Sequence, residues 1–204
     1  MISILDYGSG NINAIATLVK LSNISYEIVT HPGQLASATK ILLPGVGAFD
    51  RTMSTFRASG MANAVRMRLE DRSVACLGIC VGMHVLANSS EEGSLEGMGL
   101  VPGQVRRFHP EDIPESPKVP HMGWNTIEVH KPHPLLAGID MAQGFYFLHS
   151  YHYECDSADD VIATARHGRD FDAVVGTDRV FGVQFHPEKS HDNGIRLVRN
   201  FVDL

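Results

Sequence analysis

The stretch SVACLGICVGMH, residues 73–84, runs an apolar segment into a cysteine that is flanked by two glycines, and it ends on a histidine. Its first part, residues 73–79, is typical of a central strand that is covered on both faces. A strand that passes through Gly-x-Cys-x-Gly directly into a helix makes a sharp turn, which pushes the central side chain into the open. The stretch therefore predicts a buried strand, a tight turn and an accessible thiol at Cys80.

The rest of the chain supplies the other elements of an α/β sheet protein. Before Gly99, short apolar runs alternate with amphipathic stretches, as in a parallel sheet covered by helices. Strands are predicted over residues 1–7, 26–30 and 40–45, and helices over residues 11–23 and 60–71. After Gly99 the predicted strands are 99–108, 123–130, 144–154, 160–168 and two within 173–185, and a helix over 194–204 ends the chain. We expect one domain over residues 1–204, whose sheet continues as a mixed or antiparallel extension, with a long loop at the proline-rich residues 109–120.

Composition narrows the classes of function. The 204 residues are 44% hydrophobic, which suits one globular core, and the formal net charge of -6 disfavours binding to nucleic acid or an anionic membrane. The first apolar run breaks at Asp6, so neither a signal peptide nor a transmembrane helix is expected. The three cysteines have no CxxC spacing, which argues against a disulfide framework or a structural zinc site. We expect a cytoplasmic protein.

Cys80 is the predicted nucleophile. The positive end of the following helix favours its thiolate, and the amide of Val81 can point toward an oxyanion. A cysteine without this setting is more often a small buried hydrophobe, which is our interpretation of Cys76. A second glycine loop, LLPGVGAF at residues 42–49, ends another predicted strand. Its unobstructed amides could complete an oxyanion hole, although an ordinary turn also uses such glycines.

His186 and Glu188 are the predicted base and its orienting group. A predicted strand ends at Phe185, and Pro187 separates the two side chains. Strand ends of a parallel sheet gather at its carboxyl edge, where Cys80 also lies. A carboxylate two residues after the histidine can hold its second ring nitrogen, as in other triads. Taken alone, His186 would be a surface histidine in a turn; beside Cys80 it is a candidate base.

Several motifs, in this order, resemble those of the class I, or triad type, glutamine amidotransferases: PGVG at 44–47, GICVGM at 78–83 and FHPEKS at 185–190. Four further motifs narrow the resemblance to the glutaminase subunits of imidazole glycerol phosphate synthases: DYGSGN at 6–11, GLVPGQVRRF at 99–108, KVPHMGWN at 118–125 and FYFLHSY at 145–151. The resemblance extends from end to end of the chain. It implies a single three-layer, flavodoxin-like α/β domain with a central mixed, mostly parallel sheet flanked by helices.

The same resemblance implies a glutaminase of histidine biosynthesis that passes ammonia to a barrel-shaped cyclase subunit, its partner in a heterodimer, and that needs no cofactor. The implied triad is Cys80, His186 and Glu188. Backbone amides of Val81 and of the loop Gly45, Val46 and Gly47 would hold the oxyanion, while His149, Ser150 and Tyr151 would lie by the amino-acid end of glutamine. Asn11, Met122, Trp124 and Lys189 would meet the cyclase. The family also implies low activity until the partner reorganises the oxyanion loop.

One position departs from the family pattern. Where that pattern reads Gly-Met-Gln, this chain has Gly82-Met83-His84, and the family's glutamine lines the substrate pocket. Our preferred interpretation is that His84 replaces that glutamine's hydrogen bond to the substrate. A spectator role and a role as alternative base stay open, and the second is the weaker because His84 has no evident orienting carboxylate.

Other hypotheses are weighed against this one. A homologous glutaminase could supply a cyclase-like synthase that amidinates sugars of bacterial surface polysaccharides, which the departure at His84 slightly favours. A cysteine-elbow hydrolase or chaperone-like protein would not explain Glu188 or PHMGWN, and the intact triad argues against a silent binding subunit. The pairs His130 with His133 and His149 with His152 lack other ligands at metal spacing, so no metal site is expected. Gly8 and Gly10 lack the third glycine of a dinucleotide fingerprint.

Overall fold

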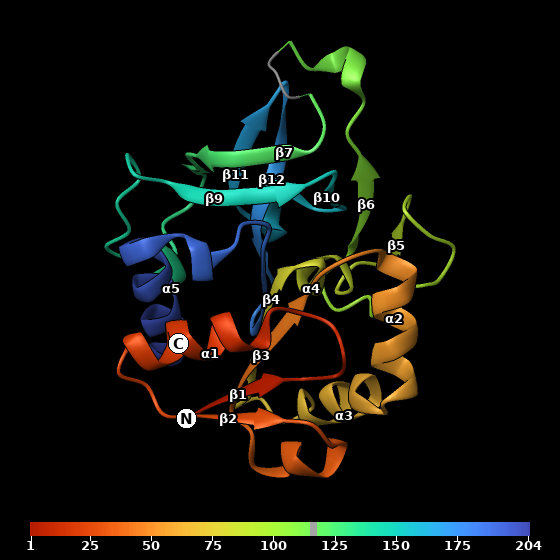
Figure 1. Cartoon of the computed structure of the whole chain (residues 1–204), viewed down its shortest axis with the longest axis vertical. Helices are drawn as coiled ribbons and strands as arrows, with labels where there is room; N and C mark the ends of the chain where they lie inside the picture. The colour runs from red at the N-terminus through yellow and green to blue at the C-terminus, as the bar shows by residue number, and fades with distance from the viewer. Residues whose placement is uncertain (115–117) are drawn as a thin grey trace.

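The computed structural model describes residues 1–114 and 118–204, in which most strands form one large mixed sheet with helices on both faces and two strands form a separate small sheet (Figure 1). The first half of the chain contains β1 (Ile2–Leu5), α1 (Ile12–Leu21), β2 (Tyr26–Val29), η1 (Pro32–Ser37), β3 (Lys40–Gly45), α2 (Phe49–Ala58), α3 (Met61–Arg68), β4 (Ala75–Cys80), α4 (Val81–His84) and β5 (Ser89–Ser90). The second half contains β6 (Gly103–Arg107), η2 (Pro110–Asp112), β7 (His121–Asn125), β8 (Glu128–Val129), η3 (Pro134–Leu136), β9 (Phe145–His149), β10 (Tyr151–Cys155), η4 (Ala158–Asp160), β11 (Val161–His167), β12 (Arg169–Gly176), β13 (Val180–Val183), η5 (Pro187–Lys189) and α5 (His191–Asp203).

The parallel part of the sheet has the strand order β2–β1–β3–β4–β13. Every residue of β4 is buried, which agrees with its prediction as a strand covered on both faces. The register pairs Gly45 of β3 with Cys80 of β4, and Val183 of β13 with Ile79. The carboxyl ends of β3, β4 and β13 therefore reach the same edge of the sheet, which is where open α/β sheets bind their ligands.

Beyond β13 the sheet becomes antiparallel through β12, β10 and β6, and β11 pairs with β12 from Arg169 to Val175. This confirms the predicted mixed sheet with its antiparallel extension. The predicted strand over residues 144–154 is divided by a bend at Ser150. Its first part, β9, pairs with β7 in a separate two-stranded sheet, whereas its second part, β10, joins the main sheet (Figure 1). That separate sheet is not anticipated by the strand pattern.

Helices cover both faces of the parallel strands and produce the expected three layers. On one face α1 and α5 pack against each other, and Leu18 and Phe201 join a core that includes Ile4. On the other face α2 and α3 enclose a second core that includes Phe56 and Leu5. Ile4 and Leu5 belong to different cores because successive side chains of a strand point to opposite faces of the sheet.

The remaining points concern helix α2, the proline-rich stretch and membrane-spanning helices. Helix α2 was not predicted, although its buried Phe49, Met53 and Phe56 recur at helical spacing. The proline-rich stretch 109–120 contains the short turn η2, and the part of this predicted loop at residues 115–117 lies outside the described residues. Within the described ranges, no helix combines the length and apolar character needed to cross a bilayer.

Candidate active site

Cys80 is the last residue of β4, and its backbone has φ 55° and ψ −114°, a combination that favours glycine. A non-glycine residue held in such a region costs roughly 1–3 kcal/mol and persists only where its surroundings enforce it. The surroundings here are close backbone segments, since a Cβ added at Gly78 or Gly82 would collide with neighbouring main-chain atoms. The tight turn predicted at Cys80 is therefore present, and the two glycines make it sterically feasible. The prediction of an openly accessible thiol was wrong, because Cys80 is only 4% exposed at the bottom of the surrounding backbone segments.

The helix after this turn is shorter than the sequence analysis assumed. Helix α4 comprises only Val81–His84, because the amides of Leu86 and Ala87 already bond to carbonyls three residues back. The charge at a helix end arises from many aligned peptide units, so one turn contributes little to the stability of a thiolate. The short helix therefore contributes the turn that positions the sulfur rather than a strong electrostatic field.

His186 and Glu188 form a buried pair directly after β13. Nδ1 of His186 donates a hydrogen bond to Oε1 of Glu188 at 2.8 Å, and their side chains are only 8% and 3% exposed. Pro187 starts the turn η5 between them and restrains the backbone. Burial alone would lower the pKa of His186, but its contacts with Cys80 and Glu188 outweigh burial and raise that pKa to about 10. His186 therefore keeps its second proton at neutral pH.

These residues meet at a cavity of about 470 Å³ at the carboxyl edge of the sheet. Nine of the residues singled out from the sequence line it: Val46, Gly47, Cys80, Val81, His84, His149, Ser150, Tyr151 and His186. Glu188 lies behind His186, and Gly45 lies beneath the loop, where an added Cβ would collide with the backbone of Val81 and Gly82. These residues come from four separate parts of the chain, and the sulfur of Cys80 also lies 3.9 Å from the carbonyl oxygen of Leu148.

Three lining residues were missed in the sequence analysis: Ala48, Glu92 and Leu148. Glu92 is the acidic side chain of this lining, and its Oε2 accepts a hydrogen bond of 2.9 Å from the amide of Phe49. Burial raises the pKa of Glu92 above its ordinary value, although the bond from Phe49 opposes this shift. Glu92 lies in a polar loop with no spacing that distinguishes it from neighbouring acids, so only its tertiary position reveals it.

The predicted oxyanion loop has an unexpected hydrogen-bond partner. The amide of Val46 donates to Oγ of Ser9 at 3.1 Å, and the same hydroxyl donates to the carbonyl of Val46 at 3.0 Å. A single N–H that is bonded to Ser9 cannot also bind an oxyanion in the cavity. In this conformation the expectation that the Val46 amide serves the oxyanion is therefore not met.

The geometry agrees with what comparison with known proteins shows. The family described as glutamine amidotransferase class-I matches residues 3–204. The chain belongs to this family. Two curated relatives are each named imidazole glycerol phosphate synthase subunit HisH. The one from Bdellovibrio bacteriovorus is 47% identical to this chain, and the one from Leptospira interrogans is 44% identical. Each alignment covers 100% of this chain and 100% of the relative. At these identities the chain also belongs to the HisH family.

Solved structures agree with this amidotransferase in fold. A structure described as a glutamine amidotransferase superposes with a TM-score of 0.72 at 21% identity, covering 99% of this chain and 97% of the other. The structure of PurLQS from Thermotoga maritima superposes with a TM-score of 0.76 at 17% identity, with coverage of 99% and 97%. At such low identity these two likenesses establish the α/β fold.

His84, where the amidotransferase departs from the family pattern, is buried against Gln184. Nε2 of His84 lies 2.8 Å from Oε1 of Gln184, and the two residues are 2% and 0% exposed. Burial lowers the pKa of His84 to about 4, so its ring is neutral near pH 7. A general base needs an orienting acceptor that stabilises its protonated form, and a neutral amide is a poor one. This environment supports a pocket-lining role over the alternative base.

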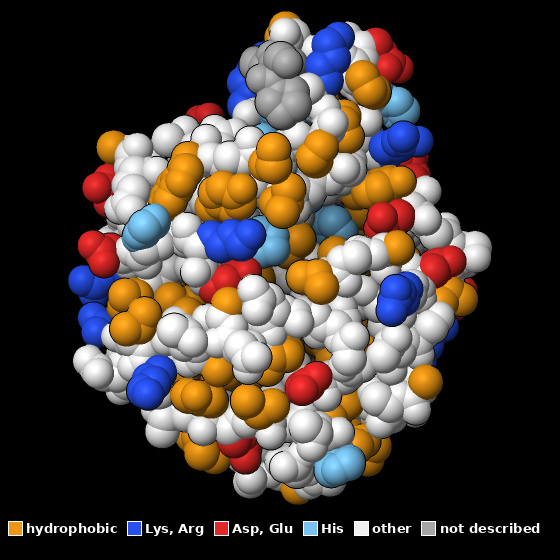
Figure 2. All heavy atoms as spheres, viewed as in Figure 1, with side chains coloured by type: hydrophobic (Ala, Val, Ile, Leu, Met, Phe, Trp, Pro, Cys, Tyr) orange, Lys and Arg blue, Asp and Glu red, His pale blue; other side chains and the backbone are white. Residues whose placement is uncertain are grey.

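The four residues predicted to meet a cyclase are exposed, on elements that contact one another. Turn η5, which carries Lys189, packs against both α1 and β9, and β9 pairs with β7. Asn11 caps α1, whereas Met122 and Trp124 of β7 are 53% and 46% exposed. Hydrophobic side chains gather over β7 and β9 on the face shown in Figure 2. The amidotransferase thus presents an apolar surface beside its cavity.

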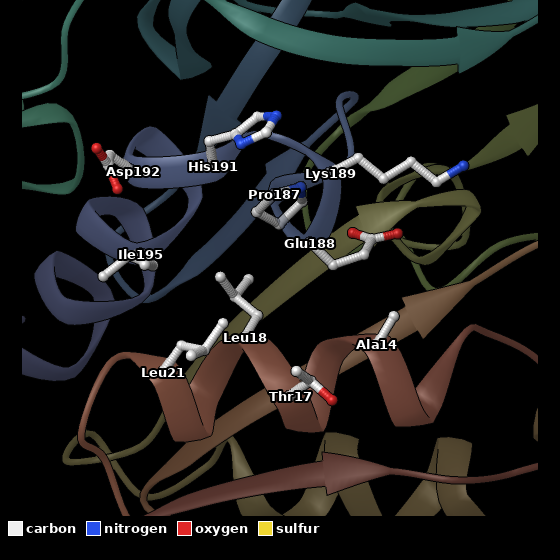
Figure 3. Close-up of a pocket in the computed structure, with 10 residues that line it drawn as sticks. All are labelled: Ala14, Thr17, Leu18, Leu21, Pro187, Glu188, Lys189, His191, Asp192 and Ile195. Atoms are coloured by element: carbon white, nitrogen blue, oxygen red, sulfur yellow. The ribbon is translucent and has the colours of Figure 1, made fainter.

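A second cavity of about 590 Å³ lies between α1 and the segment from η5 to α5 (Figure 3). Apolar side chains such as Leu18, Leu21 and Ile195 line it, and neither Cys80 nor His186 does. Glu188 borders this groove while it bonds to His186, so the His186–Glu188 pair lies between the groove and the cavity at Cys80. The groove lacks the sulfur of Cys80 and the imidazole of His186, and the smaller cavity is therefore the candidate active site.

Across residues 1–114 and 118–204, no group of three or more His, Cys, Asp or Glu side chains is arranged to hold a metal ion. The imidazole of His130 is instead 2.8 Å from the hydroxyl of Thr164.

Proposed function

We propose that the chain is a glutaminase subunit that hydrolyses the side-chain amide of glutamine and delivers the ammonia to the cyclase subunit of an imidazole glycerol phosphate synthase. The observation that carries this proposal is the convergence of Cys80, on its strained turn, with the buried His186–Glu188 pair at one cavity. The names of the full-length relatives support the choice of synthase. Its free cysteines suit the reducing cytoplasm, where we place the protein.

The chemistry follows from the arrangement of the triad. The sulfur of Cys80 attacks the side-chain amide carbon of glutamine, and the carbonyl oxygen becomes an oxyanion. His186, which holds a proton, gives it to the departing nitrogen, so ammonia leaves and a thioester forms on Cys80. His186 then takes a proton from water, whose oxygen attacks the thioester carbon; the carbon–sulfur bond breaks, and glutamate leaves with Cys80 returned as thiolate beside the protonated His186. Glu188 orients the imidazole and stabilises its charged form throughout.

The cavity also offers groups for the amino-acid end of glutamine. Glu92 supplies a negative charge that the α-ammonium group needs. The corner at His149, Ser150 and Tyr151 supplies polar groups for the α-carboxylate. His84 lines the same cavity and can hydrogen-bond the substrate in place of the family's glutamine. The binding site therefore holds both charged ends of a zwitterionic amino acid beside the sulfur.

Removing the charge of Glu92 is expected to weaken glutamine binding. The variant Glu92→Gln keeps an oxygen for the Phe49 amide but loses the attraction for the α-ammonium group. We expect KM for glutamine to rise about 10- to 100-fold, as for the loss of a charge-assisted hydrogen bond, while kcat changes little. Glu91→Gln, at an exposed neighbour that pairs with Arg106, is the matched control and should leave KM unchanged. An unchanged KM in Glu92→Gln would reject this assignment.

The contact between Ser9 and Val46 suits a glutaminase whose activity stays low until its partner binds. With the Val46 amide bonded to Ser9, the oxyanion loop offers one donor fewer to the transition state. Removal of a single oxyanion donor typically lowers kcat by about 10²- to 10³-fold. We propose that binding of the cyclase and its ligand favours a loop conformation in which this amide turns into the cavity.

Loosening this contact is expected to raise the activity of the isolated chain. In Ser9→Ala the amide of Val46 loses its partner hydroxyl and its carbonyl keeps only the longer bond from Thr52 at 3.4 Å, so the active loop conformation becomes more accessible. A difference of one or two kcal/mol corresponds to an increase of roughly 5- to 30-fold in glutamate release without the partner. The exposed Ser54 of α2 provides a control, Ser54→Ala, that should have wild-type activity. Unchanged or lower basal activity in Ser9→Ala would contradict the proposed role.

The surface around the cavity suits the cyclase partner. We propose that Asn11, Met122, Trp124 and Lys189 contact a barrel-shaped cyclase in a heterodimer, so that ammonia passes between the subunits. The decisive experiment measures glutamate release by the purified chain alone, with a histidine-pathway cyclase, and with that cyclase plus its nucleotide substrate. Strong stimulation by the loaded cyclase is expected.

Two other results have distinct meanings. Stimulation only by a cyclase-like synthase that amidinates a polysaccharide sugar would retain the glutaminase chemistry and reject the proposed pathway. No glutamine hydrolysis with any of these partners would reject the chemistry itself.

A further inference from the structure

A directional chain of hydrogen bonds runs through the buried histidines beside the cavity. Nδ1 of His149 is 2.7 Å from the carbonyl oxygen of Tyr151, which can only accept, so this nitrogen carries the hydrogen. Nε2 of the neutral His149 ring is then an acceptor, and it lies 2.9 Å from Nδ1 of His121. His121 therefore donates through Nδ1, which leaves its Nε2 as an acceptor for the amide nitrogen of Asn125 at 3.2 Å. A single placement of the ring hydrogens thus gives every one of these hydrogen bonds a donor and an acceptor.

The outer end of this chain is anchored by the backbone. The amide nitrogen of Asn125 also donates to the carbonyl of Arg166 at 2.8 Å, and its oxygen accepts from the amide of Thr126 at 2.8 Å. These two bonds leave no freedom to exchange the nitrogen and oxygen of the Asn125 side chain. The direction of donation toward His121 is thereby determined.

Packing holds the His121 ring in place. It stacks on Phe147 at 4.8 Å and 30° on one side, and on His167 at 4.4 Å and 22° on another. His167 is itself tied to the carbonyl of Lys118 by a bond of 2.7 Å. Burial lowers the pKa of His121 to about 4 and that of His149 well below its usual value, so both rings are neutral, as the chain requires.

The row of hydrogen bonds ends at the part of the cavity proposed to hold the amino-acid end of glutamine. His121 and His149 are directly paired between β7 and β9, and the polypeptide bends at Ser150 immediately after β9. The bond from His149 to the carbonyl of Tyr151 spans that bend, and all three residues 149–151 line the cavity. The orientation of the His149 ring thus helps to set the shape of this corner.

We propose that His121, which lies outside the cavity lining, is a positioning residue for glutamine binding: its hydrogen bond to His149 holds the ring that shapes the corner at residues 149–151. This inference rests on the proposed glutaminase function. It adds a residue whose effect is indirect, because His121 does not touch the substrate. The hydrogen bond from His121 to His149 also connects β7, which carries the exposed Met122 and Trp124, to the corner at residues 149–151.

Three substitutions of His121 separate its hydrogen bond from its packing. In His121→Asn the amide nitrogen sits at the position of Nδ1 and can still donate to His149. In His121→Gln the amide sits near the position of Nε2, and in His121→Phe the ring remains without either nitrogen. Assayed with the cyclase partner, Gln and Phe are expected to raise KM for glutamine roughly tenfold with kcat within about threefold, whereas Asn stays within about threefold of wild type in both. His130→Phe, at an exposed histidine, should have no effect.

A spectroscopic measurement tests the same bond in the wild-type chain. Long-range ¹⁵N–¹H correlation of the histidine rings should show His149 protonated at Nδ1 and unprotonated at Nε2. Protonation at Nε2, a wild-type KM in both His121→Gln and His121→Phe, or an equal loss in all three variants would overturn the proposal. Absence of glutamine hydrolysis by the wild-type complex would instead reject the proposed function, and the ring spectrum would still decide on the hydrogen bond.

Discussion

Replacing Cys80 by alanine is expected to abolish glutamine hydrolysis. The variant lacks the sulfur proposed to form the thioester, and Cys80 is the one cysteine among the described residues that line the cavity. Loss of a covalent nucleophile reduces kcat by a factor on the order of 10⁶, so the residual rate should be indistinguishable from background. Glutamate release in the presence of the cyclase partner, where activity is expected to be highest, is the measurement.

The chain contains matched controls for this result. Cys155→Ala removes a half-buried thiol outside the cavity and should retain full activity. Cys76 is a less useful control because it belongs to the core beneath the sheet, where burial raises its pKa to about 12. Binding of glutamine to Cys80→Ala, measured by calorimetry, should persist, since the groups for its charged ends remain. Hydrolysis retained in Cys80→Ala would refute the proposed chemistry.

Replacing Glu188 by glutamine is expected to have the second largest effect. An amide keeps the shape but cannot stabilise the imidazolium form of His186, and it can favour the wrong ring tautomer. By analogy with other triads, kcat should fall by about 10²- to 10⁴-fold. Glu188→Asp retains the charge on a shorter side chain and should recover part of the activity. Full activity in Glu188→Gln would remove Glu188 from the mechanism.

The pH dependence of the same variant follows from the raised pKa of His186. In the wild-type protein that pKa is about 10, so the contribution of the charged pair to folding stability is complete below the unfolded-state pKa of about 6.5 and is lost as pH rises through 10. Without the carboxylate the pKa of His186 falls, and the alkaline limbs of both the rate profile and the stability profile move to lower pH. Profiles of kcat and of thermal unfolding against pH measure these shifts. Unmoved limbs would show that Glu188 does not set the protonation of His186.

Local spacing explains why so much of the site was predictable. The Gly-x-Cys-x-Gly pattern after an apolar run encodes the turn at Cys80 within five residues, and His186, Pro187 and Glu188 are likewise adjacent. The mixed sheet followed from the alternation of apolar and amphipathic segments. The order of these motifs then matched one family, which the comparisons support over residues 3–204.

Glu92, Ser9 and His121 were not predictable in this way. Ser9 contacts Val46, 37 positions along the chain, because β1 and β3 are parallel neighbours and their carboxyl ends lie together. His121 meets His149 through the separate β7–β9 sheet, which exists because the chain bends at Ser150. Neither contact leaves a periodic or spaced pattern in the sequence.

The sequence by itself thus determined the class of fold and singled out the proposed reactive group and base, since each depends on interactions between residues that are close along the chain or on repeating patterns. Only the tertiary structure decided how the site is held. It bonded the Val46 amide to Ser9, buried His84 against Gln184 and assembled the hydrogen bonds from Asn125 to Tyr151. These outcomes depend on the register and crossing of distant strands, and that information is distributed over the packing of the whole domain.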